Sequence, residues 1–475
     1  MGEKSLSQRG LPRFVRRSAA RVWAVPVALG GRPPKPERAA LAGFGDRAGQ
    51  VAEVLTGKRR RLLIRCDADL EAAGALAVAR LGGVEHVAID ARGWAAADAA
   101  RFAAGGALRA WRFQRFLTRP DPERPVLARI DVLVDDPGKA RAAWAALEPG
   151  VRGALFARDM VVEPSNELTP AGFATHLRAL AAHGIEVEVL EGERLREEGL
   201  RGVLAVGGGS VNPPCIAVLR WAGNGRADPV MFVGKGITFD TGGLCIKPAQ
   251  GLWEMRADMA GAAACAGAMM ALALRGSPAA AVAVLPLAEN MTDAASYRPG
   301  DVLRLQSGTT VEVVDTDAEG RLVLADALAW GIGRYRPQAV VDLATLTGSI
   351  VVALGHHMAG LFATDDALAA HVAAAGAAVN ERAWRMPLHE GYGEPLESDI
   401  ADIRQCSDGR MQPDACLAAH FLRGFVGEVP WVHLDIAGVE SNEKASDRHA
   451  AGPTGWGARL LDRLVQDRFE DPHRS

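Results

Sequence analysis

Short apolar runs alternate with alanine-rich segments along the chain, and this pattern predicts strands that alternate with helices. In the first third, apolar runs at 61–65, 84–90 and 130–134 flank alanine-rich segments at 70–81 and 95–110. Runs of this length that end at turn residues are typical of buried strands, and alanine is the strongest helix former. The pattern predicts a small α/β domain that ends near residue 150.

The same alternation continues in the rest of the chain. Residues 230–233 form an apolar run bounded by glycine, as in a strand that is buried on both faces, and 310–314 is a second β-branched strand candidate. An alanine-rich helix is expected from about residue 252, and apolar residues at 321–330 have helical spacing. These segments predict a second, larger α/β domain.

Length and composition agree with two domains. The chain has 475 residues, of which 49% are hydrophobic, and this is enough for two separate cores. We expect a small N-terminal α/β domain at 1–152, followed at 153–475 by a larger α/β catalytic domain with a mixed sheet and helices on both faces. The net charge of −3 does not favour a polyanion binder, and no uninterrupted apolar run approaches the roughly 20 residues that cross a bilayer. We therefore expect a soluble, cytoplasmic protein without a membrane partner.

The N-terminus and the cysteines bear on location. The first 25 residues are arginine-rich with one acid. A transit peptide has a similar composition, but the whole chain is rich in alanine and arginine, so a frayed basic arm is the preferred interpretation. The six cysteines include no C-x-x-C pair and are expected to be reduced thiols.

Arginines around Phe113 and Phe116 resemble a nucleic-acid patch, although a solvated face is the more common explanation of such charges.

Two segments, 230–258 and 311–322, concentrate charged residues among glycines and apolar strands. The charged residues are Lys235, Asp240, Lys247, Asp258, Asp317, Glu319 and Arg321. Lys235 follows a predicted strand, at the end where open α/β sheets build their sites. Four carboxylates within about 4 Å would repel one another by roughly 4 kcal/mol per pair at an effective dielectric near 20. Positive charge must therefore lie between them, and two divalent cations would balance the four acids.

A site of this kind has more than one use. Paired metal ions activate a water and polarise a carbonyl or a phosphoryl group, so a peptidase and a two-metal phosphoesterase both remain open on the charges alone. Once the four acids bind metal ions, Lys247 and Arg321 remain to act on the reacting atoms of the substrate. The alternative is that one lysine is a ligand as the neutral amine, which requires a metal ion to lower its pKa far below the ordinary value.

Several long motifs stand in order between residues 157 and 461. They are GKGITFDTGGLCIKP, MRADMAGAAA, AENMTDAASYRPGDV, DTDAEGRLVLADAL, DLATLTGSIVVALG, SDIADI and WVHLDIAG. These motifs closely resemble the signature segments of the leucyl (cytosol) aminopeptidases, the two-metal M17 peptidases. The resemblance implies that Lys247 and Arg321 are the catalytic pair. It also implies a set of metal ligands, namely Lys235, Asp240, Asp258, Asp317 and Glu319.

The resemblance implies a metalloaminopeptidase that releases N-terminal, preferably leucine-like, residues from peptides by a two-metal-activated hydroxide. The metal would be manganese or zinc, with magnesium and cobalt as alternatives. Lys247 would stabilise the oxyanion, and Arg321 would hold a bicarbonate ion as general base. Met255, Thr345 and Gly348 would line the pocket for the first side chain. The family also implies a homo-hexamer. Because some bacterial relatives bind DNA, a regulatory or DNA-binding member with weak peptidase activity is the alternative.

Three positions depart from the family pattern. Asp315 stands where Asn is usual, residues 162–164 read Val-Glu-Pro in place of Asn-x-Pro, and residues 407–415 replace a glycine-rich loop. Asp315 would either raise the basicity of the bound water or cap the following turn, and both alternatives stay open. The departures put the substrate preference in question more than the reaction.

Histidines complete the candidate residues. His356 and His357 adjoin, and His433 and Asp435 alternate along a predicted strand, but no H-E-x-x-H motif is present. We expect these residues to be structural, with support of the metal ligands as their most useful further role.

Overall fold

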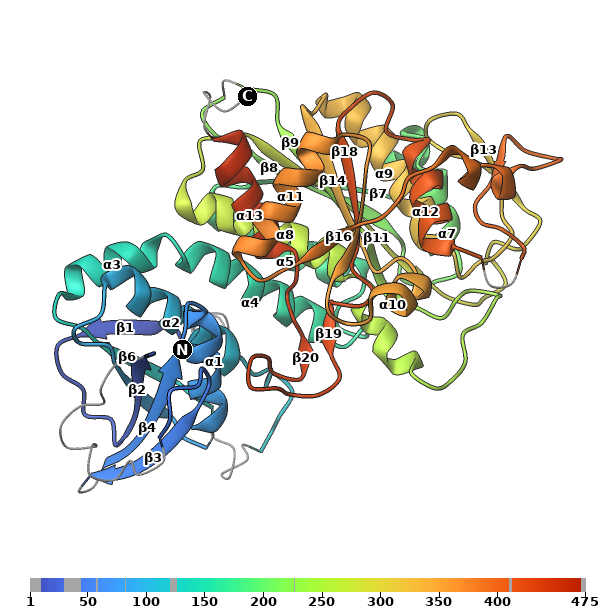
Figure 1. Ribbon diagram of the computed structural model, residues 1–475. Coiled ribbons are helices and arrows are strands. Elements are labelled where there is room, and N and C mark those ends of the chain that lie inside the picture. The colour runs from blue at the N-terminus through green and yellow to red at the C-terminus, as the bar shows by residue number, and fades with distance from the viewer. Residues whose placement is uncertain are drawn as a thin grey trace. The chain divides into compact units, whose positions relative to one another are not determined.

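The computed structural model describes residues 10–29, 44–56, 59–81, 83–119, 126–225, 227–409 and 412–470. The chain forms two compact units (Figure 1). Unit 1 comprises Met1–Val151 together with Asn442–Gly452, and unit 2 comprises Arg152–Ser441 together with Pro453–Ser475. A short segment near the C-terminus thus belongs to the first unit, which the sequence did not predict.

Unit 1 is built on one six-stranded sheet. Its strands, in spatial order, are β1 (Pro12–Val15), β6 (Arg129–Leu133), β5 (His86–Asp90), β2 (Val22–Ala28), β4 (Arg59–Cys66) and β3 (Val51–Thr56). Neighbouring strands are parallel except β3, which runs antiparallel to β4. The helices are α1 (Leu70–Arg80), α2 (Ala96–Ala110) and α3 (Pro137–Ala145). This unit is the expected small α/β domain.

Helices α1 and α2 cross closely because glycines lie at their contact. A Cβ atom at Gly74 would lie 1.8 Å from the carbonyl oxygen of Phe102, and one at Gly105 would lie 1.8 Å from that of Glu71. No side chain fits at these distances, so the alanine- and glycine-rich composition of these helices serves the packing of one helix on the other.

The expectation of a frayed arm over residues 1–25 is wrong for the described part of that segment. β1 and β2 both lie in the sheet, and Trp23 and Val25 are buried. Of the described arginines, Arg13 lies in β1, and Arg16, Arg17 and Arg21 lie between β1 and β2. All four side chains are exposed, so their charges reach solvent. Residues 1–9 lie outside the described residues.

Unit 2 contains a mixed sheet. Its spatial order is β16 (Ala383–Arg385), β15 (Ala359–Ala363), β18 (Trp431–Asp435), β14 (Ala339–Ala344), β9 (Val230–Gly234), β11 (Ala281–Asn290), β8 (Cys215–Trp221) and β7 (Glu186–Glu191). β10 (Gly236–Asp240) pairs with β11. The central strands β18, β14, β9 and β11 are parallel, and strands on both sides of them run antiparallel. The mixed-sheet α/β prediction is confirmed.

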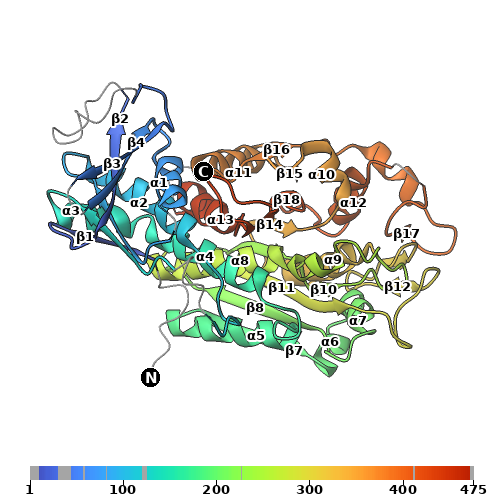
Figure 2. The ribbon, with the colours of Figure 1, turned by 90° about the horizontal axis from the view of Figure 1, so that it is seen from below.

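Helices cover both faces of this sheet (Figures 1 and 2). Met231 and Val233 of β9 belong to one core cluster with Leu324 of α9 (Glu319–Tyr335). Alternate side chains of a strand point to opposite faces, so Phe232 faces the other side, where α8 (Ala260–Arg275) contacts β9. Among the described residues, Leu252–Arg275 alone has the length and apolar composition of a membrane-crossing helix, but 83% of its apolar window is buried inside the protein. This is the behaviour of a core helix.

The remaining elements connect this frame. The α-helices are α4 (Glu148–Val162), α5 (Pro170–Arg178), α6 (Glu193–Glu197), α7 (Arg201–Gly207), α10 (Gly348–Leu354), α11 (Asp366–Ala378), α12 (Asp414–Arg423) and α13 (Ala458–Leu464). A small sheet joins β12 (Val302–Arg304), β13 (Thr310–Glu312) and β17 (Ile403–Arg404), and β19 (Ser441–Asn442) pairs with β20 (Gly452–Pro453). Shorter helical turns are η3 (Ala179–His183), η4 (Leu252–Ala257), η5 (Glu390–Tyr392), η6 (Glu394–Leu396) and η7 (Val465–Phe469).

Candidate active site

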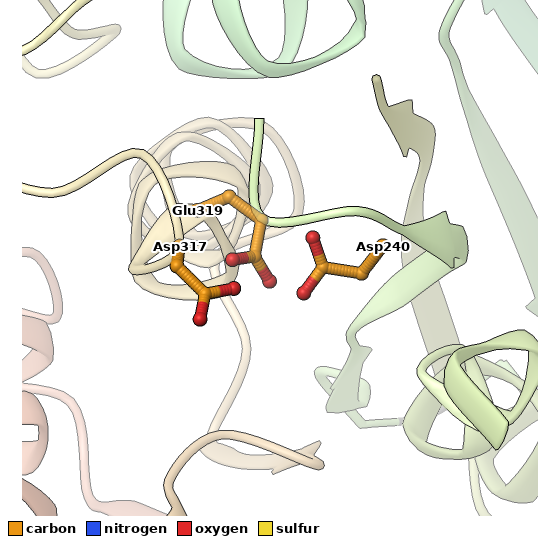
Figure 3. A group of neighbouring side chains, drawn as sticks. All are labelled: Asp240, Asp317 and Glu319. Atoms are coloured by element: carbon orange, nitrogen blue, oxygen red, sulfur yellow. The ribbon is translucent and has the colours of Figure 1, made fainter. Parts of the chain in front are cut away.

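The predicted acids gather where the parallel strands of unit 2 end. Lys235 stands between β9 and β10, and Asp240 ends β10. Glu319 is the first residue of α9, and Asp317 lies in the turn before it. Asp240, Asp317 and Glu319 can each offer one oxygen such that all three atoms lie within 4.8 Å of one another. Figure 3 shows the three carboxyl groups directed into the same small space.

Asp258 reaches the same place from a break in a helix. The sequence predicted one helix from about residue 252 with Asp258 in its early turns, but that expectation is wrong. η4 ends at Ala257 and α8 begins at Ala260, so Asp258 lies between them, and its backbone N donates to the carbonyl oxygen of Met255 at 3.3 Å. The break leaves the Asp258 side chain free of a regular helix and directs it to Lys235.

Two lysines supply the positive charge among the acids. Lys235 Nζ lies 2.8 Å from Asp258 Oδ1 and 2.8 Å from Glu319 Oε1, and it donates to the carbonyl oxygen of Thr345 at 2.9 Å. Lys247 Nζ lies 2.9 Å from Asp240 Oδ2 and also contacts Asp317 Oδ1. All five predicted ligands and Lys247 therefore form one connected cluster.

Two carboxylate oxygens in this cluster lack partners. Asp258 Oδ2 and Glu319 Oε2 are buried, and neither accepts a hydrogen bond from any described residue. A buried acceptor without a partner has a free-energy cost of roughly 1–3 kcal/mol, and more when it is charged. Such oxygens suit a hard divalent cation, whose ligands are carboxylate oxygens. The donor set therefore fits metal ions.

The pKa values in the cluster also favour bound metal ions. Burial, followed by the charges of Asp240 and Glu319, raises the pKa of Asp317 to about 7, and burial also raises the pKa of Asp258 and of Glu319. Burial disfavours the ammonium of Lys235, but the neighbouring carboxylates, first Asp258, outweigh this effect and raise its pKa. A divalent cation would act in the opposite direction on each group, because it favours the ionised acid and the neutral amine.

A second layer of hydrogen bonds orients the acids. Thr345 Oγ1 donates to Asp258 Oδ1 at 2.6 Å. Asn290 Nδ2 donates to Asp240 Oδ1 at 2.8 Å and to the carbonyl oxygen of Thr316 at 3.0 Å. Sequence reasoning did not identify Asn290, although it ends the buried strand β11 and stands inside one of the quoted motifs. A polar residue at the end of a fully buried strand is the signal that was available.

Arg321 has different hydrogen-bond partners from the two lysines. It is 2% exposed, its Nη1 donates to the carbonyl oxygen of Gln405 at 3.0 Å, and its Nη2 donates to Asp414 Oδ1 at 2.8 Å. The guanidinium is thus already paired with an acid of the chain, and the expected bicarbonate ion does not fit this arrangement.

The three predicted pocket residues differ in their surroundings. Met255 is half-buried on η4, one turn before Asp258, and Gly348 is exposed at the start of α10. Thr345 is half-buried, and its hydroxyl is committed to Asp258. Thr345 therefore supports a carboxylate of the cluster directly.

The structure favours one alternative for Asp315. Asp315 Oδ1 accepts a hydrogen bond from the backbone N of Asp317 at 2.9 Å, as an acid does when it caps a turn.

His433 is buried and its Nδ1 lies 2.6 Å from Asp342 Oδ1, which is a structural role. Asp435 accepts from the backbone N of Leu346 and from Thr347, and so holds the segment that includes Thr345.

Fold and site together are those of a metal-dependent hydrolase. The sequence model described as "Cytosol aminopeptidase family, catalytic domain" matches residues 155–462. The probable cytosol aminopeptidase of Methylobacterium radiotolerans is 43% identical over 412 residues, which are 86% of this chain and 82% of that protein.

Solved structures agree with the sequence match. The bottromycin maturation enzyme BotP in complex with Mn has a TM-score of 0.84 and 36% identity, with 94% of this chain and 99% of that chain covered. The cytosol aminopeptidase of Coxiella burnetii has a TM-score of 0.84 and 26% identity, with 97% and 99% covered. The chain belongs to the cytosol aminopeptidase family, the M17 peptidases, and is a metallo-exopeptidase of the leucyl aminopeptidase type.

Proposed function

We propose that the chain releases leucine-like N-terminal residues from peptides and holds two divalent metal ions for this reaction. The proposed ligands are Lys235, Asp240, Asp258, Asp317 and Glu319. The observation that carries the proposal is the pair of buried, unpartnered oxygens, Asp258 Oδ2 and Glu319 Oε2, inside a cluster of acids. Manganese is the first choice because the related BotP structure contains Mn, and zinc, magnesium and cobalt are the alternatives.

The metal ions would polarise the scissile carbonyl and activate the attacking water. The chain's own residues then have separate tasks. Lys247 is the candidate for the oxyanion, since its Nζ lies beside Asp240 and Asp317 and its side chain is 21% exposed, so that a substrate can reach it. An ammonium held there stabilises negative charge that develops on the carbonyl oxygen. Thr345 and Asn290 keep Asp258 and Asp240 in place.

A preference for leucine-like residues rests on the apolar side chains next to the cluster in sequence. Met255 precedes Asp258 by one turn. Ile246 and Trp253, on either side of Lys247 along the chain, are exposed large apolar residues. Apolar surface near the cluster favours a substrate whose N-terminal residue has an apolar side chain. Two substrates that differ by one methylene group in that side chain differ in binding free energy by only about 1–3 kcal/mol.

Substrate tests address this proposal. The protein with added Mn should cleave leucine p-nitroanilide with a higher kcat/KM than the alanine and glutamate analogues, and chelation should abolish the activity. The N-acetylated leucine substrate is the matched control, because an aminopeptidase requires a free amino group. Faster turnover of p-nitrophenyl phosphate than of every anilide would contradict the proposal.

The assembly and the location are part of the proposal. We expect a cytoplasmic homo-hexamer, which light scattering on the purified protein would measure. The alternative role in DNA binding is tested by electrophoretic mobility shift at physiological salt. With a net charge of −3, we expect no retained complex.

A further inference from the structure

Arg321 has a charge partner from the chain itself. Its guanidinium is buried, and Asp414 Oδ1 accepts from Nη2 at 2.8 Å while the carbonyl oxygen of Gln405 accepts from Nη1 at 3.0 Å. Burial disfavours the charged guanidinium, and Asp414 is the strongest of the negative charges that outweigh burial and raise the pKa of Arg321. The buried cation therefore depends on Asp414.

Asp414 comes from the segment where this chain departs from its relatives. It is the first residue of α12 and lies within the replaced segment 407–415. Its side chain is 39% exposed, so the carboxylate reaches from the surface to a guanidinium that is 2% exposed. The Asp414 carboxylate is thus the acceptor that Arg321 Nη2 already has.

A second anion on this guanidinium would lie close to the Asp414 carboxylate. Arg321 Nε is the remaining nitrogen, and it is buried and has no hydrogen-bond partner among the described residues. An ion at Nε would have to reach a buried nitrogen atom. It would also place its charge beside the Asp414 carboxylate, and two anions on one cation repel each other.

We propose that Asp414 is a built-in anion that replaces a bound bicarbonate on Arg321, so that this enzyme works without an exogenous anion at that position. Asp414 is a positioning residue, because it acts through Arg321 two residues after Glu319 in α9. The inference rests on the proposed peptidase function for its activity readout.

The first test needs no variant. The wild-type enzyme with Mn should hydrolyse leucine p-nitroanilide at the same rate in carbonate-free buffer and in buffer with added bicarbonate. An increase of kcat with bicarbonate in the wild type would overturn the inference.

Two variants separate charge from shape. Asp414→Ala opens the space and should lose roughly tenfold in kcat in carbonate-free buffer, as loss of an outer partner of a site commonly does, and bicarbonate should restore it. Asp414→Asn fills the space without charge, so its kcat should fall and bicarbonate should not restore it. Asp408→Ala is the matched control, because it removes an exposed acid from the same loop. An Asp414→Ala variant that keeps full kcat without bicarbonate would contradict the inference.

A binding measurement separates this inference from the proposed function. Bicarbonate that binds the folded state raises Tm. It should raise the Tm of Asp414→Ala and leave the Tm of the wild type and of Asp414→Asn unchanged. The Tm measurement does not depend on catalysis. If no aminoacyl substrate is cleaved, the peptidase proposal fails, but the Tm values still test the role of Asp414. Equal Tm shifts for the wild type and Asp414→Ala would overturn the inference that Asp414 replaces a bound bicarbonate ion.

Discussion

The hydroxyl of Thr345 holds the carboxylate of Asp258, with Oγ1 and Oδ1 2.6 Å apart. Thr345 follows β14, whereas Asp258 lies in the break between η4 and α8, so this bond ties two segments 87 residues apart. The other oxygen, Asp258 Oδ2, is buried and accepts no hydrogen bond from a described residue. A side chain that the family resemblance assigned to the substrate pocket thus orients a proposed metal ligand.

This relationship predicts the effect of Thr345→Val, which keeps the shape and removes the hydroxyl. Loss of a partner that orients a ligand commonly weakens metal affinity about 10–100-fold, and we expect a loss in that range in a Mn titration. Thr175→Val, at an exposed position of α5, is the matched control. A variant with unchanged metal affinity and a raised KM would show that Thr345 acts only as a pocket wall.

Lys247 should act on the transition state. Lys247→Ala is expected to lower kcat by about 10²-fold or more, because a donor to the oxyanion is lost, while the loaded enzyme keeps its metal. In the protein without metal, the same change removes the cation beside Asp240 and Asp317, so Tm should fall more without metal than with it. Lys139→Ala, at an exposed position of α3, should change neither value. An unchanged kcat for Lys247→Ala would exclude the oxyanion role.

Unit 1 offers a prediction that is independent of the active site. The buried Asp131 accepts from Ser18 at 2.7 Å, from His86 at 2.9 Å and from Arg129 at 2.9 and 3.0 Å. Asp131→Asn removes the charge and should destabilise the protein by about 2 kcal/mol, as for charged hydrogen bonds of this kind. Asp399→Asn, at an exposed position, is the control.

The pH dependence of this effect has a definite sign. Burial would raise the pKa of Asp131, but the hydrogen bonds from Arg129, Ser18 and His86 outweigh it and lower the pKa below the ordinary value. An acid with a lowered folded-state pKa stabilises the protein above the unfolded pKa, near 4, and loses this contribution as pH falls further. The Tm difference between the wild type and Asp131→Asn should therefore be constant near neutrality and shrink only in acid. A difference that grows on acidification would contradict the assignment.

The sequence could predict the parts of this protein that depend on local pattern. The glycine-bounded run before Lys235 is the buried strand β9, and the helical spacing after Glu319 is α9. Thr169 followed by Pro170 is a local pattern typical of a helix start, and the Thr169 hydroxyl accepts from the backbone N of Gly172 at 3.1 Å. Motifs that place charges at strand ends also predicted which residues converge.

The remaining features depend on contacts between distant segments. The segment at 442–452 belongs to unit 1 and forms ion pairs with it, such as Arg448 with Asp69. A local sequence pattern does not predict contacts between segments so far apart along the chain. The break at Asp258 lies inside an alanine-rich stretch whose propensity favours a continuous helix, and tertiary contacts override that propensity. The pairing of Arg321 with Asp414 likewise appears only when α9 and α12 are packed together.

The most direct test of the account is the metal content of the protein. After loading with Mn and removal of free metal, elemental analysis of the wild type should give two ions per chain, and Asp258→Ala and Asp317→Ala should each bind fewer and lose activity. Asp228→Asn, at an exposed position, should match the wild type. Two ions per chain in Asp317→Ala, or none in the wild type, would contradict the proposed ligand set.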